Sequence, residues 1–345
     1  MPNDVLTAAI DALAERRDLT EAQAAGVLAE IMSGNCGESQ IAAFLIALRT
    51  KGETVEEIAG LAATMRSLAT PVPTRRDDLL DTAGTGGGRH TFNVSTTAAL
   101  VAAAAGCAVA KHGNRSATRA SGSADVLEAL GARIDLEPAA VGRCIDEIGF
   151  GFMFAPAHHA ATRFVIPARK ELAVRTIFNF LGPLTNPAGA RRQVVGVSDP
   201  NYIDALAGAL ARLGCDRALV VSSADGLDEM STSAPTHVVE VNGDELRRYD
   251  VSPADVGLTE SPPEAIAGGG PEANAATTRA VFAGATGADA DLVLLNAGAA
   301  IYAAGRVEAL RAGVELAREV IASGAAARTL EDYVRISGEL APKAA

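Results

Sequence analysis

Tryptophan is absent from this sequence and other aromatic residues are few: aromatics make up 4% of the 345 positions, whereas 48% are hydrophobic. Alanine, valine and leucine dominate the hydrophobic share, which argues against a core that depends on aromatic packing. Such small side chains suit helices packed closely on a parallel sheet better than an aromatic-rich β-sandwich. The length is enough for two domains or for one large one.

Long hydrophobic runs are also missing. The alanine-rich apolar run at 98–105 is much shorter than the roughly 18 residues that a membrane-spanning helix needs. The first 13 residues carry Asp4 and Asp11 and no basic region, so they do not resemble a signal peptide. We therefore expect a cytoplasmic protein without a membrane partner.

Cysteine and positive charge are scarce as well. Cys36, Cys107, Cys144 and Cys215 lie far apart without a C-x-x-C pair, which is typical of small buried residues in a reducing compartment. Lys and Arg number 30 against 42 Asp and Glu, a net charge of -12, so we expect no nucleic-acid partner. Small anions remain possible ligands, because backbone amides and a few basic side chains can form a local positive pocket.

The N-terminal part of the chain predicts helices alone. Thr20-x-x-Gln23 and Thr54-x-x-Glu57 both fit capping boxes ahead of periodic apolar residues. Two prolines near residue 72 then indicate a linker. We therefore expect a small all-helical domain over 1–72.

The remainder, 73–345, predicts an α/β domain with a mostly parallel central sheet flanked by helices. A strand at 78–83, a loop, a helix at 94–105 and a strand at 107–110 form a βαβ unit. Further strands are expected at 150–154, 193–197, 218–222 and 292–295, with a hairpin of 237–241 and 245–249 around Asn242-Gly243.

Three polar segments follow expected strands, at the edge where parallel sheets bind ligands. The first, Gly84–Gly88, lies between a strand and a helix, a placement that favours an anion site over an ordinary turn. The second, Lys111–Ser116, combines cationic side chains with neutral hydrogen-bond donors, which suits a phosphate-rich ligand. Alone it could also be a solvated basic turn. The two segments are expected at one edge of the sheet, and this shared location favours the phosphate site. The third is Asp225–Glu229. Taken alone, this segment fits an exposed acidic turn as well as it fits a metal site. Because it is expected opposite two phosphate-binding loops, we interpret it as a Mg²⁺ site.

These segments carry a specific resemblance. GTGG, N-x-S-T, KHGNR, VRTIFNFLGPLTNP (174–187) and D-G-x-D-E stand in the order and approximate spacing seen in anthranilate phosphoribosyltransferases, which the chain resembles over nearly its whole length. The resemblance implies transfer of the phosphoribosyl group of 5-phosphoribosyl 1-pyrophosphate (PRPP) to the amine of anthranilate, in tryptophan biosynthesis. It also implies Mg²⁺ as cofactor and a homodimer through the helical domain, which residues 168–190 complete.

The resemblance also implies the site residues. PRPP would be bound by Gly84, Gly87, Gly88, Thr91, Asn93, Ser95, Thr96, Lys111, His112, Gly113, Asn114, Arg115, Ser116, Ala117, Thr118, Arg119 and Ser123. Mg²⁺ would be held by Ser95, Asp228 and Glu229, and anthranilate by Gly84, Asn114 and Arg169. No residue is expected as an obligatory acid or base, because the anthranilate amine is neutral at pH 7; positioning and electrostatics would supply the catalysis.

The chain departs from the family pattern at two places. Gly88 stands where the family usually has Asp, in a loop that is one residue short, and Ala160 follows His159 where the family tends to have His-Pro. Arg89, in the altered loop, has two interpretations of equal weight: a contact to donor phosphate, or a solvated side chain.

Two other functions are compatible with parts of the pattern. A nucleoside phosphorylase of the same fold would also handle a ribosyl carbon and phosphate, but KHGNR and the acidic pair argue against it. A catalytically silent relative that binds phosphates or nucleic acid is opposed by the intact motifs and by the net charge of -12.

Overall fold

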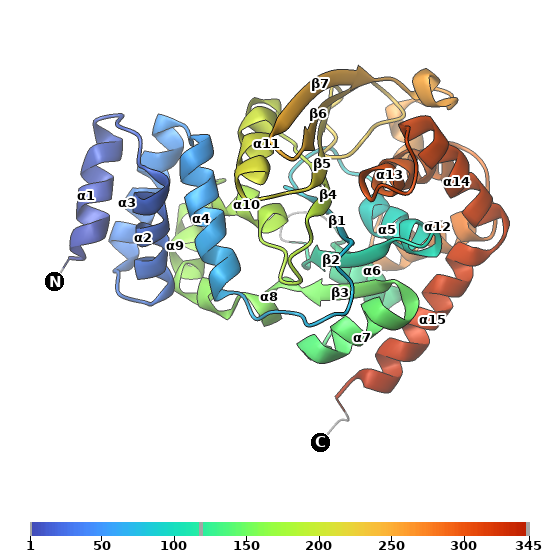
Figure 1. Ribbon diagram of the computed structural model, residues 1–345, viewed down its shortest axis with the longest axis horizontal. Coiled ribbons are helices and arrows are strands. Elements are labelled where there is room, and N and C mark those ends of the chain that lie inside the picture. The colour runs from blue at the N-terminus through green and yellow to red at the C-terminus, as the bar shows by residue number, and fades with distance from the viewer. Residues whose placement is uncertain (1, 117–119, 343–345) are drawn as a thin grey trace.

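The structure, a computed structural model, describes residues 2–116 and 120–342. A helical bundle at the N-terminus is followed by an α/β unit around one sheet (Figure 1). The helices are α1 (Asp4–Ala14), α2 (Glu21–Met32), α3 (Glu38–Lys51), α4 (Val55–Leu68), α5 (Val94–Ala104), α6 (Ser123–Ala129), α7 (Pro138–Ile148), α8 (Ala155–His158), α9 (Ile166–Leu172), α10 (Phe178–Leu181), α11 (Ile203–Arg212), α12 (Pro271–Phe282), α13 (Ala288–Ala303), α14 (Leu310–Ala322) and α15 (Ala325–Leu340). Short 3-10 helices lie at Ala160–Phe164, Gly182–Leu184, Pro200–Tyr202, Pro253–Val256 and Pro263–Ile266.

The sheet of the described chain has seven strands in the order β3-β2-β1-β4-β5-β6-β7. The strands are β1 (Leu79–Gly84), β2 (Ala108–Gly113), β3 (Phe150–Phe154), β4 (Arg192–Gly196), β5 (Arg217–Ser223), β6 (Thr236–Asn242) and β7 (Glu245–Val251). Strands β1 to β5 are parallel, and β6 and β7 add an antiparallel hairpin at one edge, as the Asn242-Gly243 turn predicts. The predicted α/β fold with a mostly parallel sheet is confirmed.

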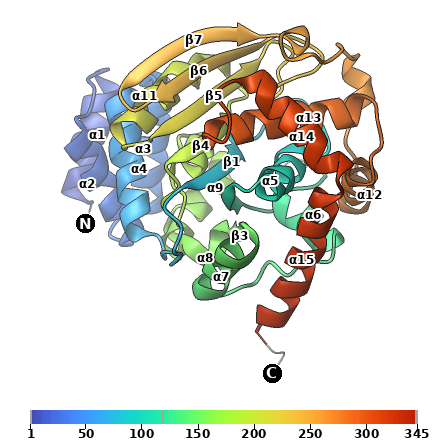
Figure 2. The ribbon, with the colours of Figure 1, turned by 45° about the vertical axis from the view of Figure 1, so that its right-hand side comes forward.

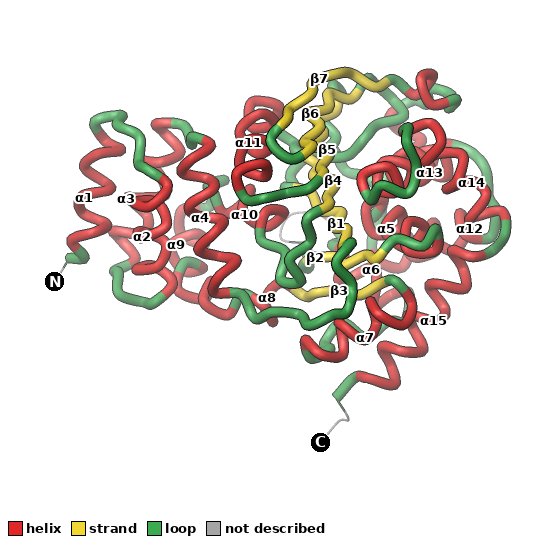
Figure 3. Tube along the Cα trace, viewed as in Figure 1, coloured by secondary structure: helices red, strands yellow, loops and turns green. Residues whose placement is uncertain are grey.

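Helices cover both faces of this sheet, so its central strands are buried on both sides. Figures 2 and 3 show the strands running between two groups of helices. Neighbouring residues of one strand point into different cores: Val194 belongs to the core beneath α5 and α13, whereas Val195 belongs to the core shared with the N-terminal helices. Strands of this kind are rich in aliphatic residues without polar alternation, which is the composition of β4 and β5.

The N-terminal helices form as their sequence predicts. Both capping boxes are present: the side chains of Thr20 and Thr54 accept from the backbone N–H groups of Gln23 and Glu57, which cap in return. The hydrophobic cluster of α1 to α4 also contains buried side chains from a later segment, among them Ala168, Ile177, Phe178, Phe180 and Leu181. The later segment therefore packs beside the N-terminal helices, where α9 and α10 lie in Figure 1.

One expected strand is wrong. Residues Leu292–Leu295 lie inside the 16-residue helix α13 and not in the sheet. Helix α13 is buried almost all round, against α5 and α14, so its apolar residues occur without the periodicity of an amphipathic helix. A short apolar run of this kind has the same pattern in a buried strand and in a buried helix.

Two smaller expectations concern cysteine and membranes. All four cysteines are free; Cys107, Cys144 and Cys215 are buried, whereas Cys36 is half-exposed. Among the described residues, no helix has the length and apolar character to cross a bilayer.

The second capping box makes a stability prediction, because Glu57 is fully buried. Its carboxylate accepts from the backbone N–H of Leu19 (2.9 Å) and Thr54 (2.8 Å) and from Lys51 Nζ (2.9 Å). In Glu57→Gln the amide NH₂ would face at least one of these donors and the charge paired with Lys51 would be lost, so we expect the free energy of unfolding to fall by about 3 kcal/mol in chemical denaturation.

Gln23→Ala is the matched control, because Gln23 holds the same position in the exposed capping box. We expect it to lower the free energy of unfolding by less than about 1 kcal/mol. Equal losses in the two variants would show that the buried carboxylate is no more important than an ordinary cap.

Candidate functional site

A cavity of about 610 Å³ lies at the carboxyl ends of the parallel strands. The chain crosses from β1 to β2 on one side and the sheet continues through β4 on the other, so the strand order reverses at β1, which is where ligands bind in open α/β sheets. The cavity is lined by Gly84–Gly88, His90–Asn93, Ser95, Asn114–Ser116, Ser121–Ser123, Arg175, Asn179, Asp228 and Glu229.

The glycine-rich loop forms one wall of this cavity. Gly86 and Gly87 have φ values of +67° and +84°, which favour glycine. The Gly86 N–H donates to Asp228 Oδ2 at 2.9 Å, so the loop lies directly on the acidic segment. A Cβ at Gly88 would lie 2.6 Å from Asp228 Oδ1. The departure from the family's usual Asp at this position therefore matches a loop that packs too closely for any side chain.

The structure gives Arg89 a protein partner. Its guanidinium pairs with Asp225 at 2.8 Å and its side chain is 24% exposed, so it is neither solvated nor part of the cavity wall. The Arg89 backbone N–H also donates to the Gly226 carbonyl. Arg89 thus joins the glycine-rich loop to the acidic segment, and its contact to donor phosphate stays a prediction.

The start of α5 forms the second wall. Asn93 is its N-cap residue, but its side chain does not cap the helix. Instead, Asn93 Oδ1 accepts from Ser121 Oγ (2.8 Å) and from Asn274 Nδ2 (2.9 Å). The first backbone N–H groups of an 11-residue helix thus lack a side-chain cap beside Ser95, a geometry that favours an anion. Thr96 is buried and does not line the cavity.

The basic segment after β2 divides into a buried and an accessible part. Lys111 and His112 belong to β2 and are buried, and neither lines the cavity, nor does Gly113. Lys111 Nζ donates to the Thr82 carbonyl and to Thr82 Oγ1. Burial lowers the pKa of Lys111 to about 8, against the opposing effect of the carboxylates of Asp81 and Glu229.

Residues after β2 reach the cavity surface. Asn114, Arg115, Ser116 and Ser123 line it. Arg115 is bound to carboxylates, with distances of 2.8 Å to Asp125 and 2.5 Å to Glu128. Ala117, Thr118 and Arg119, which the resemblance adds to this set, lie outside the described residues.

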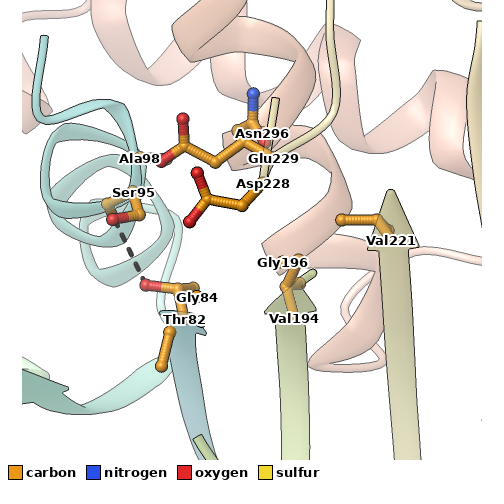
Figure 4. A pocket seen from close by; sticks show the side chains of 11 residues that line it. Thr82, Gly84, Ser95, Ala98, Val194, Gly196, Val221, Asp228, Glu229 and Asn296 are labelled. Atoms are coloured by element: carbon orange, nitrogen blue, oxygen red, sulfur yellow. Dashed lines mark hydrogen bonds between the residues drawn. The ribbon is translucent and has the colours of Figure 1, made fainter. Parts of the chain in front are cut away.

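The acidic pair lies across from the start of α5. Asp228 and Glu229 line both the large cavity and an adjoining space of about 20 Å³ with Ser95, and Figure 4 shows the Asp228 carboxylate pointing toward Ser95 and Gly84. Within the described residues no group of three His, Cys, Asp or Glu side chains is arranged so that it could hold a metal ion by itself. A cation here would complete its shell with oxygen from a ligand or water, which is how Mg²⁺ usually binds.

Arg169 lies apart from the large cavity, in the last turn of α9. Its guanidinium lies 5.5 Å from the Phe178 ring, and burial lowers its pKa. Among the described residues it makes no ion pair. Arg169 is therefore a partly buried cation without a carboxylate, close to the segment that joins the two cores.

Several cavity residues were not assigned from the sequence. Ser121, Arg175 and Asn179 line the cavity, although Arg175 and Asn179 stand in the highly specific VRTIFNFLGPLTNP segment. The motif marks this segment as important, but only the fold shows which of its side chains face the glycine-rich loop.

Comparison with known proteins agrees with this geometry. Residues 7–69 match the helical bundle domain and residues 76–327 the a/b domain of the glycosyl transferase family. The anthranilate phosphoribosyltransferase of Symbiobacterium thermophilum is 55% identical over 92% of this chain and 94% of its own length. That of Rubrobacter xylanophilus is 50% identical over 99% of this chain and 100% of its own length.

Solved structures of the same enzyme share the fold. The enzyme from Thermus thermophilus superposes with a TM-score of 0.91 at 48% identity, over 96% of this chain and 99% of the other. The Saccharomyces cerevisiae enzyme in complex with PRPP and Mg reaches 0.89 at 28% identity, and its complex with 4-fluoroanthranilate 0.87 at 28%; each covers 97% of this chain and 98% of the other. The resemblance drawn from the motifs is confirmed: the chain belongs to the anthranilate phosphoribosyltransferase family.

Proposed function

We propose that this protein transfers the phosphoribosyl group of PRPP to the amine of anthranilate, giving N-(5-phosphoribosyl)anthranilate and pyrophosphate for tryptophan biosynthesis. The observation that carries the proposal is the convergence of three elements on one cavity of about 610 Å³: the glycine-rich loop, the start of α5 and the pair Asp228–Glu229. Backbone N–H groups there suit phosphate oxygens, and the carboxylates suit a cation that accompanies them.

PRPP is placed in this cavity. Its phosphates meet the backbone of Gly84–Gly88, the start of α5 and the side chains of Asn114, Ser116 and Ser123, all of which line the cavity. Lys111 does not line the cavity, but its buried ammonium interacts with Glu229 and adds positive charge close to the bound donor. Thr96 and His112 are likewise buried and do not line the cavity.

Magnesium is assigned to Ser95, Asp228 and Glu229. The fit rests on two carboxylates and a hydroxyl that share one small space at the strand ends, a set of oxygen donors that would hold Mg²⁺. When bound, Mg²⁺ supplies charge stabilisation to the departing pyrophosphate. The chain itself orients the carboxylates: Asn296 Oδ1 accepts from the Met230 N–H at 3.1 Å, which fixes the backbone next to Glu229.

Anthranilate is placed between the helical bundle and the sheet, near Gly84, Asn114 and Arg169. Arg169 binds the carboxylate of anthranilate. Its half-buried guanidinium forms no ion pair among the described residues and can therefore pair with a ligand anion. The neutral amine attacks the anomeric carbon as the C–O bond to pyrophosphate breaks, and the nitrogen then releases its proton to water, so no general base is needed. Catalysis then consists of holding the amine against the anomeric carbon and stabilising the leaving group.

We also propose the division of the chain at residue 72, with residues 168–190 completing the helical domain, a homodimer through that domain, and a cytoplasmic location. The packing of Ala168, Ile177 and Leu181 into the core of the N-terminal helices supports the completed domain.

The decisive experiment is an incubation of the protein with PRPP, Mg²⁺ and a panel of acceptors, with the products read by mass. The proposal expects an anthranilate adduct and pyrophosphate. Turnover of a nucleoside with phosphate, without any anthranilate adduct, would assign the protein to nucleoside phosphorolysis instead.

Arg169→Ala should impair the use of anthranilate far more than the use of PRPP. Loss of a charged hydrogen bond costs about 1.5–3 kcal/mol, so kcat/KM for anthranilate should fall roughly 10- to 100-fold. Steady-state kinetics with each substrate varied in turn measures this. Lys170→Ala, the exposed neighbour on the same helix, is the control and should leave both values near wild type. Equal losses for the two substrates would argue against an acceptor role for Arg169.

The double variant Asp228→Asn, Glu229→Gln should lower activity and raise the Mg²⁺ concentration needed for half-maximal rate, since amide oxygens bind Mg²⁺ less strongly than carboxylates. A Mg²⁺ titration of the rate measures the shift. Asp244→Asn with Glu245→Gln changes an equivalent pair on the exposed β6–β7 turn and controls for lost charge. A titration that is the same in both double variants would remove Asp228 and Glu229 from the metal site.

A further inference from the structure

Arg175 is a cavity-lining cation that none of the site-residue assignments includes, although it lies in the VRTIFNFLGPLTNP segment. It lies between α9 and α10 and lines the large cavity next to the glycine-rich loop. It also lines a smaller space of about 60 Å³ with Arg49, Glu53 and Tyr202, on the side of the helical bundle. Arg175 therefore stands between the proposed donor site and the helical domain.

The guanidinium of Arg175 is held in place but incompletely bonded. Its Nη1 donates to Ser198 Oγ at 2.9 Å, and its carbon lies 5.3 Å from the centre of the Phe180 ring. Its Nη2 is buried and has no hydrogen-bond partner among the described residues. A buried guanidinium N–H without an acceptor is unfavourable, so this nitrogen is suited to a ligand that brings one.

Arg175 also contacts the loop that is proposed to bind phosphate. A Cβ added to Gly87 would collide with Arg175 Nη1, so the loop backbone and the guanidinium lie in direct contact. An anion on the backbone N–H groups of this loop is thus within reach of the guanidinium. Arginine suits such an anion because its fork of donors matches phosphate oxygens.

Two other cations of the described chain at or behind the cavity wall are already engaged. Arg115 is paired with Asp125 and Glu128, and Lys111 lies behind the wall, bonded to Thr82. Among the arginines that line the described cavity, Arg175 is the one without a carboxylate partner in the described chain.

Hydrogen bonds on both sides fix the position of Arg175. Arg49 Nη1, from α3, donates to the Arg175 carbonyl at 2.9 Å. On the other side, Ser198 Oγ donates to the Gly86 carbonyl at 2.8 Å. The path from α3 through Arg175 and Ser198 to Gly86 joins the helical domain to the glycine-rich loop.

We propose that Arg175 is a further donor-binding residue, whose guanidinium contacts the diphosphate of PRPP and, by that contact, ties the helical domain to the occupied loop. The inference rests on the proposed function for the identity of the donor. A tether without a ligand contact would need only the bond to Ser198, which leaves the buried Nη2 unexplained.

The test measures binding of inorganic pyrophosphate with Mg²⁺ by calorimetry, and KM for PRPP and anthranilate, in Arg175→Ala, Arg175→Lys and Ser198→Ala. We expect Arg175→Ala to weaken pyrophosphate binding about 10-fold or more, with a shallower dependence on salt, and to raise KM for PRPP more than KM for anthranilate. Arg175→Lys keeps the charge without the fork and should fall between Arg175→Ala and wild type. Ser198→Ala removes the tether alone, and we expect less than about a 3-fold change.

Thermal unfolding of each variant shows whether it is folded. If Arg175→Ala does not fold, the comparison uses Arg175→Lys in its place. Pyrophosphate affinity unchanged in the folded Arg175 variants, or lowered equally by Ser198→Ala, would overturn the proposal. Wild-type protein that binds pyrophosphate with the help of Arg175 but forms no anthranilate adduct would instead overturn the proposed acceptor and leave the role of Arg175 intact.

Discussion

The close approach of Asp228 to three glycines is the constraint on which the site depends. A Cβ at Gly84 would lie 2.9 Å from Asp228 Oδ2 and one at Gly88 2.6 Å from Oδ1, and at Gly196 it would collide with the Asp228 carbonyl. Gly84 and Gly196 end the adjacent strands β1 and β4. Only at strand ends without side chains does the acidic segment lie close enough to share one cavity with the phosphate-binding loop.

A second buried network places the basic segment relative to this cavity. Asp81, in β1, accepts from Asn186 Nδ2 at 2.8 Å and from the His112 backbone N–H at 3.1 Å. Burial raises the pKa of Asp81, and the nearby ammonium of Lys111 opposes this effect. Asn186 also donates to the Ala110 carbonyl. The last asparagine of the VRTIFNFLGPLTNP segment thus has a structural role, in binding that segment to β1 and β2.

The two ends of the same segment act differently. Asn186 is buried against β1 and β2, whereas Arg175 faces the cavity and the helical bundle. A single stretch of chain therefore connects the sheet, the proposed donor site and the helical domain. The proposed reaction depends on positioning and not on acid–base chemistry. A rigid connection of this kind keeps the two substrates at a fixed distance and orientation.

The sequence alone determined many of the secondary structure elements and the family of this protein. Local patterns were sufficient for the capping boxes at Thr20 and Thr54, for the strand at Phe150–Phe154 and for the hairpin around Asn242-Gly243, because each depends on residues that are near one another in the chain. The motifs likewise identified the family and the segments that meet at the sheet edge.

Tertiary structure decided the features that depend on residues far apart in the chain. Leu292–Leu295 lie in helix α13, whose burial almost all round removes the helical periodicity from their sequence. Arg89 pairs with Asp225. Arg175 is held at the cavity by Ser198, just after β4, and by Arg49 of α3. Periodicity and spacing report which residues prefer to be buried, whereas the partner of a charged side chain is set by which elements the fold brings together.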